Sequence, residues 1–382
     1  MLSLEILLAF AIVFGVAAFG LRYAQLYRMP LGFDGAGVWS VSIDSGHHRD
    51  ARIDAEVYET LRRGLAELPE VAGVGFASFE PYAMSTISSD VRRNGNAGQV
   101  YTEMMDGDDG LAGVLGLNLV EGRWFSQLDN GAAQRPVVIN RRMAEAMFPG
   151  ERALGQQFVD GEGAKIAATY RVVGVVDDYR AKGELSAPVN FIFTRFEPGK
   201  SERDARTILL KLRPGTQRDF ERRLNARLKL IRNDWTYQIA PLSSTRASMM
   251  KSRTIPLIVV GVIAAFMLLM VAFGLFGALW QNTTQRIPEI GLRRALGASA
   301  ADIYRQIVAE QFVLSSIAIA LGLVLLVQLP LTRVLGESLD WQVFAAAALL
   351  SMAVIYLISS LCAVYPGWRA SRLSPTEALH YE

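Results

Sequence analysis

Hydrophobic residues are concentrated in four long stretches of the chain, whereas the segment between the first two has the mixed composition of a soluble domain. A helix needs about 20 consecutive apolar residues to cross the hydrocarbon core of a bilayer. The four stretches lie at residues 6–21, 255–280, 312–331 and 343–365, and the first two contain no charged residue. This pattern predicts an α-helical membrane protein with transmembrane helices at 1–28, 254–281, 311–331 and 343–365.

The first stretch has a second interpretation, a cleaved signal peptide. Such a peptide begins with basic residues, whereas this stretch begins with Glu5 and no lysine or arginine, and no small-x-small cleavage motif precedes Arg22. The third and fourth stretches have an alternative too, as buried core helices of a soluble protein. Their occurrence beside the uninterrupted apolar run at 255–280 favours membrane helices.

Basic residues near the predicted helices indicate the orientation of the chain, because Lys and Arg accumulate in short cytoplasmic loops. The loop at 332–342 holds one arginine and two acidic residues. The arginines gather instead after the second and fourth helices, namely Arg286, Arg293, Arg294, Arg305, Arg369 and Arg372. We therefore expect the loop at 282–310, the C-terminal tail and the N-terminus to lie in the cytoplasm, and residues 29–250 to form one large extracytoplasmic domain.

The extracytoplasmic segment alternates between short strand patterns and amphipathic helix patterns, which predicts an α+β domain. Strands are expected at 38–43, 71–79, 135–140, 170–176, 189–194 and 207–212. One helix is expected at 51–68, and a second follows a T-x-x-D start from Thr216 to Asp219. The stretch at about 105–163 is rich in turn residues, and we expect it to form a second, inserted subdomain.

The extracytoplasmic segment shows no Ser-His-Asp, Cys-His or metal-ligand constellation, so the sequence predicts neither a catalytic site nor a metal site. The acidic run at 106–109 lacks the spacing and the closing Glu of an EF-hand, and we expect a solvated turn there. The GKS at 199–201 belongs to no phosphate-binding loop, because Thr194 stands where that loop requires glycine. We therefore expect no ATP binding by this chain itself.

Composition excludes some further classes of function. The net charge is only +2, which gives no bulk field for nucleic acid. The single cysteine, Cys362, has no partner for an intramolecular disulfide, and the three histidines are too few for a histidine-based metal site. The adjacent pair His47 and His48 is expected on a loop surface.

Small residues recur at four-residue spacing in two of the predicted membrane helices, as Gly274 with Ala278 and as Ala318 with Gly322. This spacing allows two helix backbones to approach closely. The alternative is the ordinary frequency of Gly and Ala in membrane helices.

The loop between the second and third membrane helices carries a predicted short helix from Pro288 to Leu296. Proline is tolerated at the first helical position, and Gly297 suits the end of the helix. Ser299 followed by Asp302 then predicts the start of the next helix. A short helix at this place offers a docking surface for a partner, and the alternative is a basic anchor beside the membrane.

Several motifs resemble, in the expected order, those of ABC-transporter permeases of the MacB/FtsX/LolC-LolE type. The run EIGLRRALGAS at 289–299 resembles the coupling segment of that family, and YPGWRASRLSPTEALHYE at 365–382 resembles its closing signature. The predicted extracytoplasmic domain matches the family as well. Its matching motifs are GLNLVEGRWF at 116–125, VVIN at 137–140, FPGERALG at 148–155 and YRVVGVV at 170–176. The resemblance covers nearly the whole chain, with a permease domain at 251–382.

The resemblance implies a dimeric permease of a bacterial inner membrane that transmits ATP-driven motion to its extracytoplasmic domain. ATP and Mg would be bound by a separate cytoplasmic ATPase subunit. The family's contacts with that subunit map onto Glu289, Ile290, Gly291, Leu292, Arg293, Arg294 and Gly297, with Arg369 and Arg372 as basic contacts in the cytoplasmic tail. In MacB-like members a periplasmic adaptor protein docks on the domain and substrate leaves through an outer-membrane channel, which implies efflux by mechanotransmission.

Two features depart from the family pattern. Members carry a basic amphipathic helix before the first span, so the true N-terminus is expected to lie upstream or the partner permease to supply this feature. Gln285 stands where the family commonly has Glu. Both a homodimer and a heterodimer with a sister permease therefore stay open.

An alternative function is that of an FtsX-like signal transducer, which controls a periplasmic or cell-wall partner without transport. A third function, that of a membrane-anchored enzyme, is disfavoured because no catalytic constellation is present.

Overall fold

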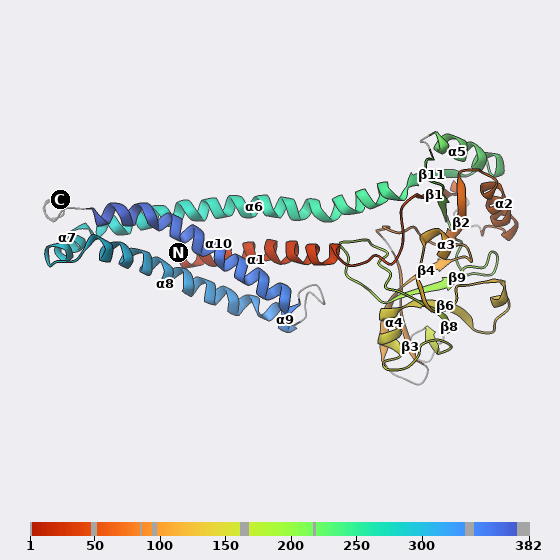
Figure 1. The fold of residues 1–382 in the computed structure, drawn as a ribbon, viewed down its shortest axis with the longest axis horizontal. Helices are drawn as coiled ribbons and strands as arrows, with labels where there is room; N and C mark the ends of the chain where they lie inside the picture. Colours follow the sequence, from red (N-terminus) through yellow and green to blue (C-terminus); the bar gives the residue numbers. More distant parts are fainter. Residues whose placement is uncertain are drawn as a thin grey trace. The chain divides into compact units, whose positions relative to one another are not determined.

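Figure 1 shows the fold in a computed structural model, which describes residues 2–46, 52–84, 86–93, 98–160, 168–216, 219–332 and 340–372. The chain divides into two compact units. A helical unit is formed by Met1–Tyr27 and Arg253–Glu382, and an α/β unit is formed by Arg28–Ser252. The predicted fold class, four apolar helices with a large domain of strands and helices after the first, is confirmed. His47 and His48 lie outside the described residues.

The helical unit is built from long helices that are apolar along most of their length. These are α1 (Leu2–Tyr27), α6 (Leu242–Gln285), α8 (Ala300–Leu326) and α10 (Trp341–Ser371), together with the short α7 (Ile287–Ala295) and α9 (Gln328–Thr332). In the described part of the chain, four helical segments are long and apolar enough to cross a membrane, which confirms the prediction. α6 extends beyond its predicted span, and its first turns belong to the α/β unit.

Helices α1 and α8 approach each other at small residues. Ala318 of α8 is fully buried, and the position of Gly322 one turn later faces the ring of Phe10 in α1. A Cβ atom at Gly322 would lie 2.6 Å from Cδ1 of Phe10, so a larger residue here would displace that ring. Gly274 of α6 is exposed, although a Cβ atom there would lie 3.0 Å from Oε2 of Glu5 in α1. The small-residue spacing therefore serves helix packing in α8, as predicted.

Polar contacts also join the helices of this unit. Ser315 of α8 and Ser359 of α10 are both buried and share a hydrogen bond of 2.9 Å. Arg22 near the end of α1 forms an ion pair of 3.8 Å with Asp340, the residue before α10. Because lipid tails provide no hydrophobic driving force between helices, close packing and such polar contacts stabilise their association.

We predict that Gly322→Leu destabilises the helical unit by about 1–3 kcal/mol, because the new side chain overpacks the contact with Phe10. The measurement is the thermal unfolding of the full chain in detergent, followed by tryptophan fluorescence. Gly277→Leu is the control, since a Cβ atom there meets no heavy atom within 4 Å. An equal loss of stability in both variants would contradict the packing argument.

One part of the α/β unit is a four-stranded antiparallel sheet covered by two helices. The strand order is β11–β1–β10–β2, and Trp39 of β1 lies opposite Leu210 of β10. The strands are β1 (Val38–Asp44), β2 (Val71–Ala77), β10 (Thr207–Leu212) and β11 (Thr236–Pro241), and the helices are α2 (Ala55–Ala66) and α5 (Phe220–Ile231). Their shared core includes Leu61 of α2 and Leu224 of α5. The predicted β-strands and both amphipathic helices of this part are confirmed.

The predicted T-x-x-D start of α5 is wrong in its detail. The helix begins at Phe220, and Asp219 precedes it without making a side-chain cap. The hydroxyl of Thr216 instead donates a hydrogen bond of 2.8 Å to the carbonyl oxygen of Arg213. The apolar face of α5 therefore outweighs a local capping signal, as tertiary packing commonly does.

The other part of the α/β unit is a closed barrel of six strands. The pairings run β4–β3–β7–β8–β6–β9 and return from β9 to β4. These strands are β3 (Ile87–Arg93), β4 (Gln99–Gly107), β6 (Arg135–Asn140), β7 (Gln157–Asp160), β8 (Ala168–Val176) and β9 (Phe191–Arg195). β2 pairs with β4 and thereby joins the two parts.

Four shorter elements accompany this six-stranded barrel. They are α3 (Leu111–Leu115), β5 (Leu119–Gly122), the 3-10 helix η2 (Gln127–Asp129) and α4 (Arg141–Met147). Asn140 starts α4, because its side chain accepts a hydrogen bond of 3.0 Å from the N–H of Met143. The inserted subdomain at 105–163 stays a prediction, and the described strands of that stretch pair with β8 and β9, which lie outside it.

Candidate functional site

The helix α7, which the sequence predicts as a docking element, has the expected local structure. Pro288 stands in its first turn with Glu289, and the helix ends before Gly297, whose φ of +101° is one that glycine adopts readily. Ser299 then begins α8 with a reciprocal cap: its hydroxyl accepts from the N–H of Asp302 at 3.2 Å, and the Asp302 carboxylate accepts from the N–H of Ser299 at 3.0 Å. The predicted helix–turn–helix of this loop is confirmed.

Contacts with α8 and α10 hold α7 in place. Ile290 is buried in a small cluster with Ile303 of α8 and Ala370 of α10. Arg294 donates a hydrogen bond of 2.6 Å to the carbonyl oxygen of Ser371. Helix α7 is therefore packed against the ends of two long helices.

The seven predicted docking residues of the loop differ in their exposure. Ile290 and Gly291 are buried against the helical unit, and Arg294 contacts α10. Arg293 is half-buried and donates to Gln306 at 2.7 Å and to Glu289 at 2.6 Å. Glu289, Leu292 and Gly297 are exposed.

Leu296 is a surface residue that sequence reasoning left out of the site. Its side chain is 80% exposed, and Leu292, one turn earlier on the same face, is 57% exposed. Residues four apart are neighbours on a helix surface, so the two leucines form one apolar patch, and their i, i+4 spacing is the signal that could have identified it. The patch is adjacent to the charged Glu289 and Arg293, which makes α7 a surface with an apolar centre and polar neighbours.

Arg369, which the sequence places in a cytoplasmic tail, lies on helix α10, and Arg372 directly follows that helix. α10 continues past Pro366 as far as Ser371, so Arg369 belongs to its last turn and Arg372 follows directly. The sequence predicts the end of this membrane helix near Tyr365, where the apolar run ends, and the helix continues through Pro366 although proline usually breaks helices. In membrane helices, neighbouring groups can satisfy the backbone that proline frees, and Pro366 is buried in the helical unit here.

A buried arginine organises the loop at residues 178–186, which we call the Arg180 loop. Arg180 is 2% exposed. Its guanidinium donates to the carbonyl oxygens of Met29 at 3.1 Å, Ser186 at 2.7 Å and Glu184, and its backbone N–H donates to Leu31 at 2.9 Å. The loop is thereby bonded to the segment that directly follows α1.

The Arg180 loop also contacts the beginning of α6. Glu184 is buried and accepts a hydrogen bond of 2.5 Å from Arg246 in α6. Leu242 and Met249, on neighbouring turns of α6, belong to the same hydrophobic core as Tyr179 of the loop. One loop of the α/β unit therefore contacts both chain segments that lead to the helical unit.

Backbone geometry shows that the Arg180 loop has a defined shape. Gly183 has a φ of +84°, and a Cβ atom there would lie 2.6 Å from the ring of Tyr82. Tyr82 itself has a φ of +68°, in the left-handed region, and its N–H donates to Ala181 at 2.6 Å. A non-glycine residue in this region costs on the order of 1 kcal/mol and persists only where the surroundings hold it. These contacts keep the loop in one conformation.

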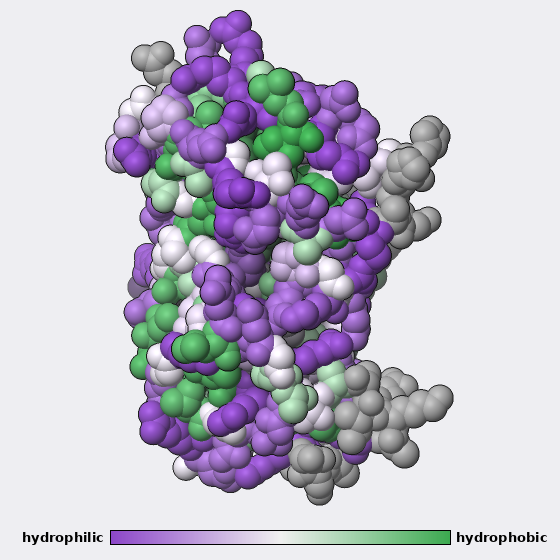
Figure 2. Space-filling model, turned by 90° about the vertical axis from the view of Figure 1, so that its right-hand side faces the viewer, coloured by the Kyte–Doolittle hydropathy of each residue, from purple (hydrophilic) through white to green (hydrophobic). Residues whose placement is uncertain are grey.

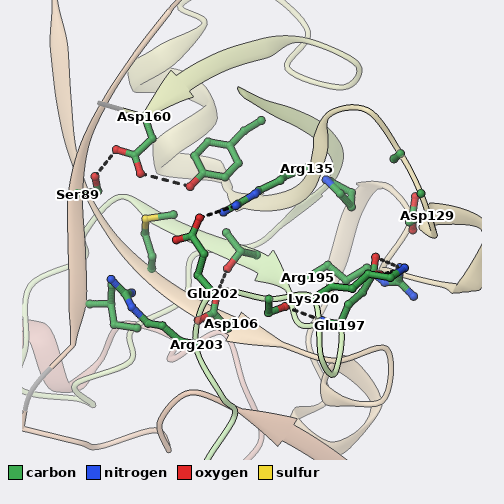
Figure 3. A pocket seen from close by; sticks show the side chains of 18 of the residues that line it. Ser89, Asp106, Asp129, Arg135, Asp160, Arg195, Glu197, Lys200, Glu202 and Arg203 are labelled. Atoms are coloured by element: carbon green, nitrogen blue, oxygen red, sulfur yellow. Dashed lines mark hydrogen bonds and ion pairs between the residues drawn. The ribbon is translucent and has the colours of Figure 1, made fainter. Parts of the chain in front are cut away.

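A polar cavity of about 300 Å³ lies beside strands of the six-stranded barrel (Figure 3). Its charged groups are largely paired with each other: Arg135 binds Glu202 at 2.5 Å, and Arg195 binds Glu197 at 2.8 Å. Asp160 accepts a hydrogen bond of 2.5 Å from Ser89. The pair of Arg135 and Glu202 connects the segment after β9 to β6, and the bond of Ser89 to Asp160 connects β3 to β7.

The acidic run at 106–109 is not the solvated turn that the sequence predicts. Asp108 is buried, and burial raises the pKa of its carboxyl group, while the adjacent guanidinium of Arg62 opposes that rise. Burial also raises the pKa of Asp106, which accepts a hydrogen bond from Thr194. Asp109 is exposed and pairs with Arg195 at 2.9 Å. The run terminates β4 and fixes neighbouring segments, a role visible only once those partners are in place.

The GKS segment at 199–201 is a turn that leads to β10. Lys200 pairs with Glu197 at 2.9 Å, and the hydroxyl of Ser201 accepts from the N–H of Glu197 at 2.8 Å. A phosphate-binding loop would instead lead into a helix. Among the described residues, no group of three or more His, Cys, Asp or Glu side chains could hold a metal ion.

The face of the molecule in Figure 2 is mostly hydrophilic, and its hydrophobic residues form small, separate patches. The most exposed large apolar residues of the α/β unit are single side chains on different elements: Met84 before β3, Leu128 in η2 and Leu230 in α5. This surface therefore has the character of a water-exposed domain, in contrast to the apolar surfaces of α6 and α8.

Comparison with known proteins gives two matches along the chain. Residues 6–226 match the family of the MacB-like periplasmic core domain, and residues 261–375 match the FtsX-like permease C-terminal family. The uncharacterized ABC transporter permease YknZ of Bacillus subtilis is 26% identical over 287 residues, which cover 72% of this chain and 69% of YknZ.

Two further relatives are longer than this chain. The macrolide export ATP-binding/permease protein MacB of Bdellovibrio bacteriovorus is 29% identical over 282 residues, 68% of this chain and 41% of that protein. The pyoverdine export ATP-binding/permease protein PvdT of Pseudomonas putida is 26% identical over 346 residues, 85% of this chain and 50% of that protein. The chain thus spans half or less of these two relatives.

Among solved structures, the periplasmic region of MacB from Actinobacillus actinomycetemcomitans aligns with a TM-score of 0.40 at 15% identity, over 59% of this chain and 98% of that one. The family matches cover more than half of the chain and agree with its four membrane helices. The chain therefore belongs to the ABC transporter permeases that combine a MacB-like periplasmic core domain with an FtsX-like permease domain.

Proposed function

We propose that this chain is the permease subunit of an ABC transporter complex and couples ATP hydrolysis by a separate ATPase subunit to a conformational change of its α/β unit. The ATPase subunit docks on α7, and the coupled motion drives export by mechanotransmission. The chain itself contributes no catalytic group, and ATP and Mg are bound by the ATPase subunit. The observation that carries this proposal is the continuity of α6.

Helix α6 is a single 44-residue element with its two ends in the two places that the mechanism requires. Its first residue, Leu242, is buried in the core of the α/β unit beside Tyr179. Its last residue, Gln285, is two residues before the start of α7 at Ile287. A helix transmits displacement along its axis because each turn is hydrogen-bonded to the next.

The orientation follows from the arginines at the α7 end. Arg286, Arg293, Arg294 and Arg305 lie on or beside α7 and the start of α8, and Lys and Arg favour the cytoplasmic side of short loops. We place α7 and both termini in the cytoplasm and the α/β unit outside an inner membrane. The second permease copy or sister permease, and a periplasmic adaptor with an outer-membrane channel, complete the proposed assembly.

The docking surface is the exposed side of α7, formed by Leu292 and Leu296 with Glu289 and Arg293 beside them. Apolar side chains that are exposed on a short polar helix gain free energy when a partner covers them, and neighbouring charges provide specificity. Ile290 and Gly291 are buried on the opposite side of the helix and lie outside the proposed docking surface.

A photo-crosslinking experiment tests the proposed docking. A photoreactive phenylalanine analogue is introduced at Leu292 in the full chain, native membranes are irradiated, and crosslinked proteins are identified by mass spectrometry. We expect a nucleotide-binding protein as the main product. The same analogue at Leu230, which is even more exposed (80% against 57%) but lies on α5, should give no such product. Absence of a nucleotide-binding protein at Leu292, or its presence at both positions, would refute the docking site.

A further inference from the structure

An aromatic cluster lies where α6 and α10 approach α7. Trp280 of α6 and Tyr365 of α10 stack with ring centroids 5.9 Å apart and an angle of 7° between their planes. Phe276 stacks on the Trp280 side at 6.3 Å, and Trp368 continues from Tyr365 at 6.3 Å. Tyr365 and Trp368 are each almost half exposed. The four rings form a continuous surface shared by two helices.

Two guanidinium groups lie on this aromatic surface. The Cζ atom of Arg369 is 4.4 Å from the ring centroid of Trp280, and that of Arg372 is 4.4 Å from the ring centroid of Trp368. Both arginines are exposed, and neither forms an ion pair with any residue that the structure describes. A guanidinium over an aromatic face keeps the N–H donors at its edge available for an anion.

A small cavity opens beside Arg369 between α6, α7 and α10. Its volume is about 120 Å³, and it is lined by Trp280, Thr283, Thr284, Ile287, Pro366, Arg369 and Ala370. Its walls combine apolar side chains, one aromatic ring and one positive charge. Such a combination suits a group with a negative charge at one end and apolar parts at the other.

The cluster marks the boundary between the apolar and polar parts of both helices. Before it, α6 exposes Phe273 and α10 exposes Leu361, at 72% and 64%. After it, α6 ends at Gln285 and α10 at Ser371, with no large apolar side chain in between on their exposed sides. In membrane proteins, Trp and Tyr at such a boundary lie at the level of the lipid headgroups.

We propose that Arg369 and Arg372, held over Trp280 and Trp368, bind the headgroup phosphate of an anionic phospholipid from the surrounding leaflet. The guanidinium edges donate hydrogen bonds to the phosphate oxygens, and the ring surface of Phe276 and Tyr365 contacts the glycerol and the first acyl carbons. Basic sites between membrane helices at this depth have the chemistry that anionic headgroups require. This inference needs only the membrane insertion of the helices and is independent of the ATPase docking proposed above.

Lipid binding to the purified full chain in detergent tests the inference, with native mass spectrometry as the readout. Phosphatidylglycerol is the anionic probe and phosphatidylcholine the zwitterionic reference. Arg369→Gln with Arg372→Gln should weaken phosphatidylglycerol binding about 25-fold, because each arginine near an anionic headgroup contributes a factor of about five. Phosphatidylcholine binding should stay unchanged.

Two controls make the result specific. Arg305→Gln removes an exposed arginine from the same end of the helical unit and should leave phosphatidylglycerol binding intact. Arg369→Lys with Arg372→Lys keeps both charges and should retain most of the affinity, so a general failure of folding would be visible as a loss in this variant too. Equal losses in the Arg305 and double Gln variants would overturn the proposal.

Three other results would also overturn it. Unchanged phosphatidylglycerol binding in the double Gln variant would place the lipid elsewhere. Full competition by millimolar inorganic phosphate would assign the site to a free anion. Loss of the crosslink from Leu292 to a nucleotide-binding protein, with lipid binding preserved, would make the two arginines ATPase contacts, as the family resemblance implies.

Discussion

Replacing Arg180 by methionine is expected to destabilise the α/β unit by about 4 kcal/mol and to separate its movements from those of the membrane helices. The arginine is buried, and its guanidinium donates to three backbone carbonyl oxygens, those of Met29, Glu184 and Ser186. A buried carbonyl that loses its partner costs about 1–3 kcal/mol. Methionine fills a similar volume but donates no hydrogen bond.

The effect of Arg180→Met should exceed that of a surface arginine because of where its partners lie. Met29 belongs to the segment after α1, and the loop that carries Arg180 also binds α6 through Glu184 and Arg246. Losing the arginine releases the loop from the first of these segments and displaces Glu184. We therefore expect normal membrane insertion, a lower unfolding temperature and a loss of permease-dependent stimulation of ATP turnover.

Thermal unfolding of the full chain in detergent and limited proteolysis of residues 28–252 measure this prediction. Arg222→Met is the matched control, because Arg222 makes an exposed ion pair with Asp219 on α5, and such a pair contributes about 0–1 kcal/mol. Arg180→Lys should fall between the two, since one ammonium group cannot reach all three carbonyls. If Arg180→Met unfolds at the same temperature as the wild-type chain, the hydrogen bonds of Arg180 do not stabilise the α/β unit and the prediction is wrong.

The second large effect is expected at the exposed leucines of α7. Leu292→Asp with Leu296→Asp should reduce ATP turnover of the reconstituted complex to the level of the ATPase subunit alone. Burying one leucine contributes about 1.5–3 kcal/mol, so losing two apolar contacts and burying two carboxylates would weaken docking by more than 100-fold. Because both side chains are exposed in the free chain, its stability should change little.

ATP turnover and co-purification of the ATPase subunit are the measurements for this double variant, with Leu230→Asp on α5 as the control. Retained turnover in the double variant would exclude this face of α7 as the docking surface. Arg293→Glu with Arg294→Glu should also abolish turnover, but it is a less direct test. Arg294 holds α7 to Ser371, and Arg293 bonds Gln306, so this change loosens α7 itself.

Local signals were sufficient for the elements of this fold. Hydropathy predicted the four membrane helices because each must match the thickness of a bilayer by itself. Proline at the first turn and glycine after the last predicted α7, since the groups involved are within a few residues of each other. The small-residue spacing of Ala318 and Gly322 indicated helix contact but not the partner, Phe10, which is more than 300 residues away in sequence.

The sequence by itself therefore determined the membrane class, the family and the position of α7, because each depends on short segments or on motifs in order. The tertiary structure alone decided the closure of the six-stranded barrel, the burial of Asp108 and the hydrogen bonds of Arg180. Each of these depends on groups far apart in sequence: β4 pairs with β9 to close the barrel, and Arg180 donates a hydrogen bond to Met29, 151 positions away. Periodicity reports which face of an element is apolar, whereas only packing decides which distant segment that face and its polar neighbours meet.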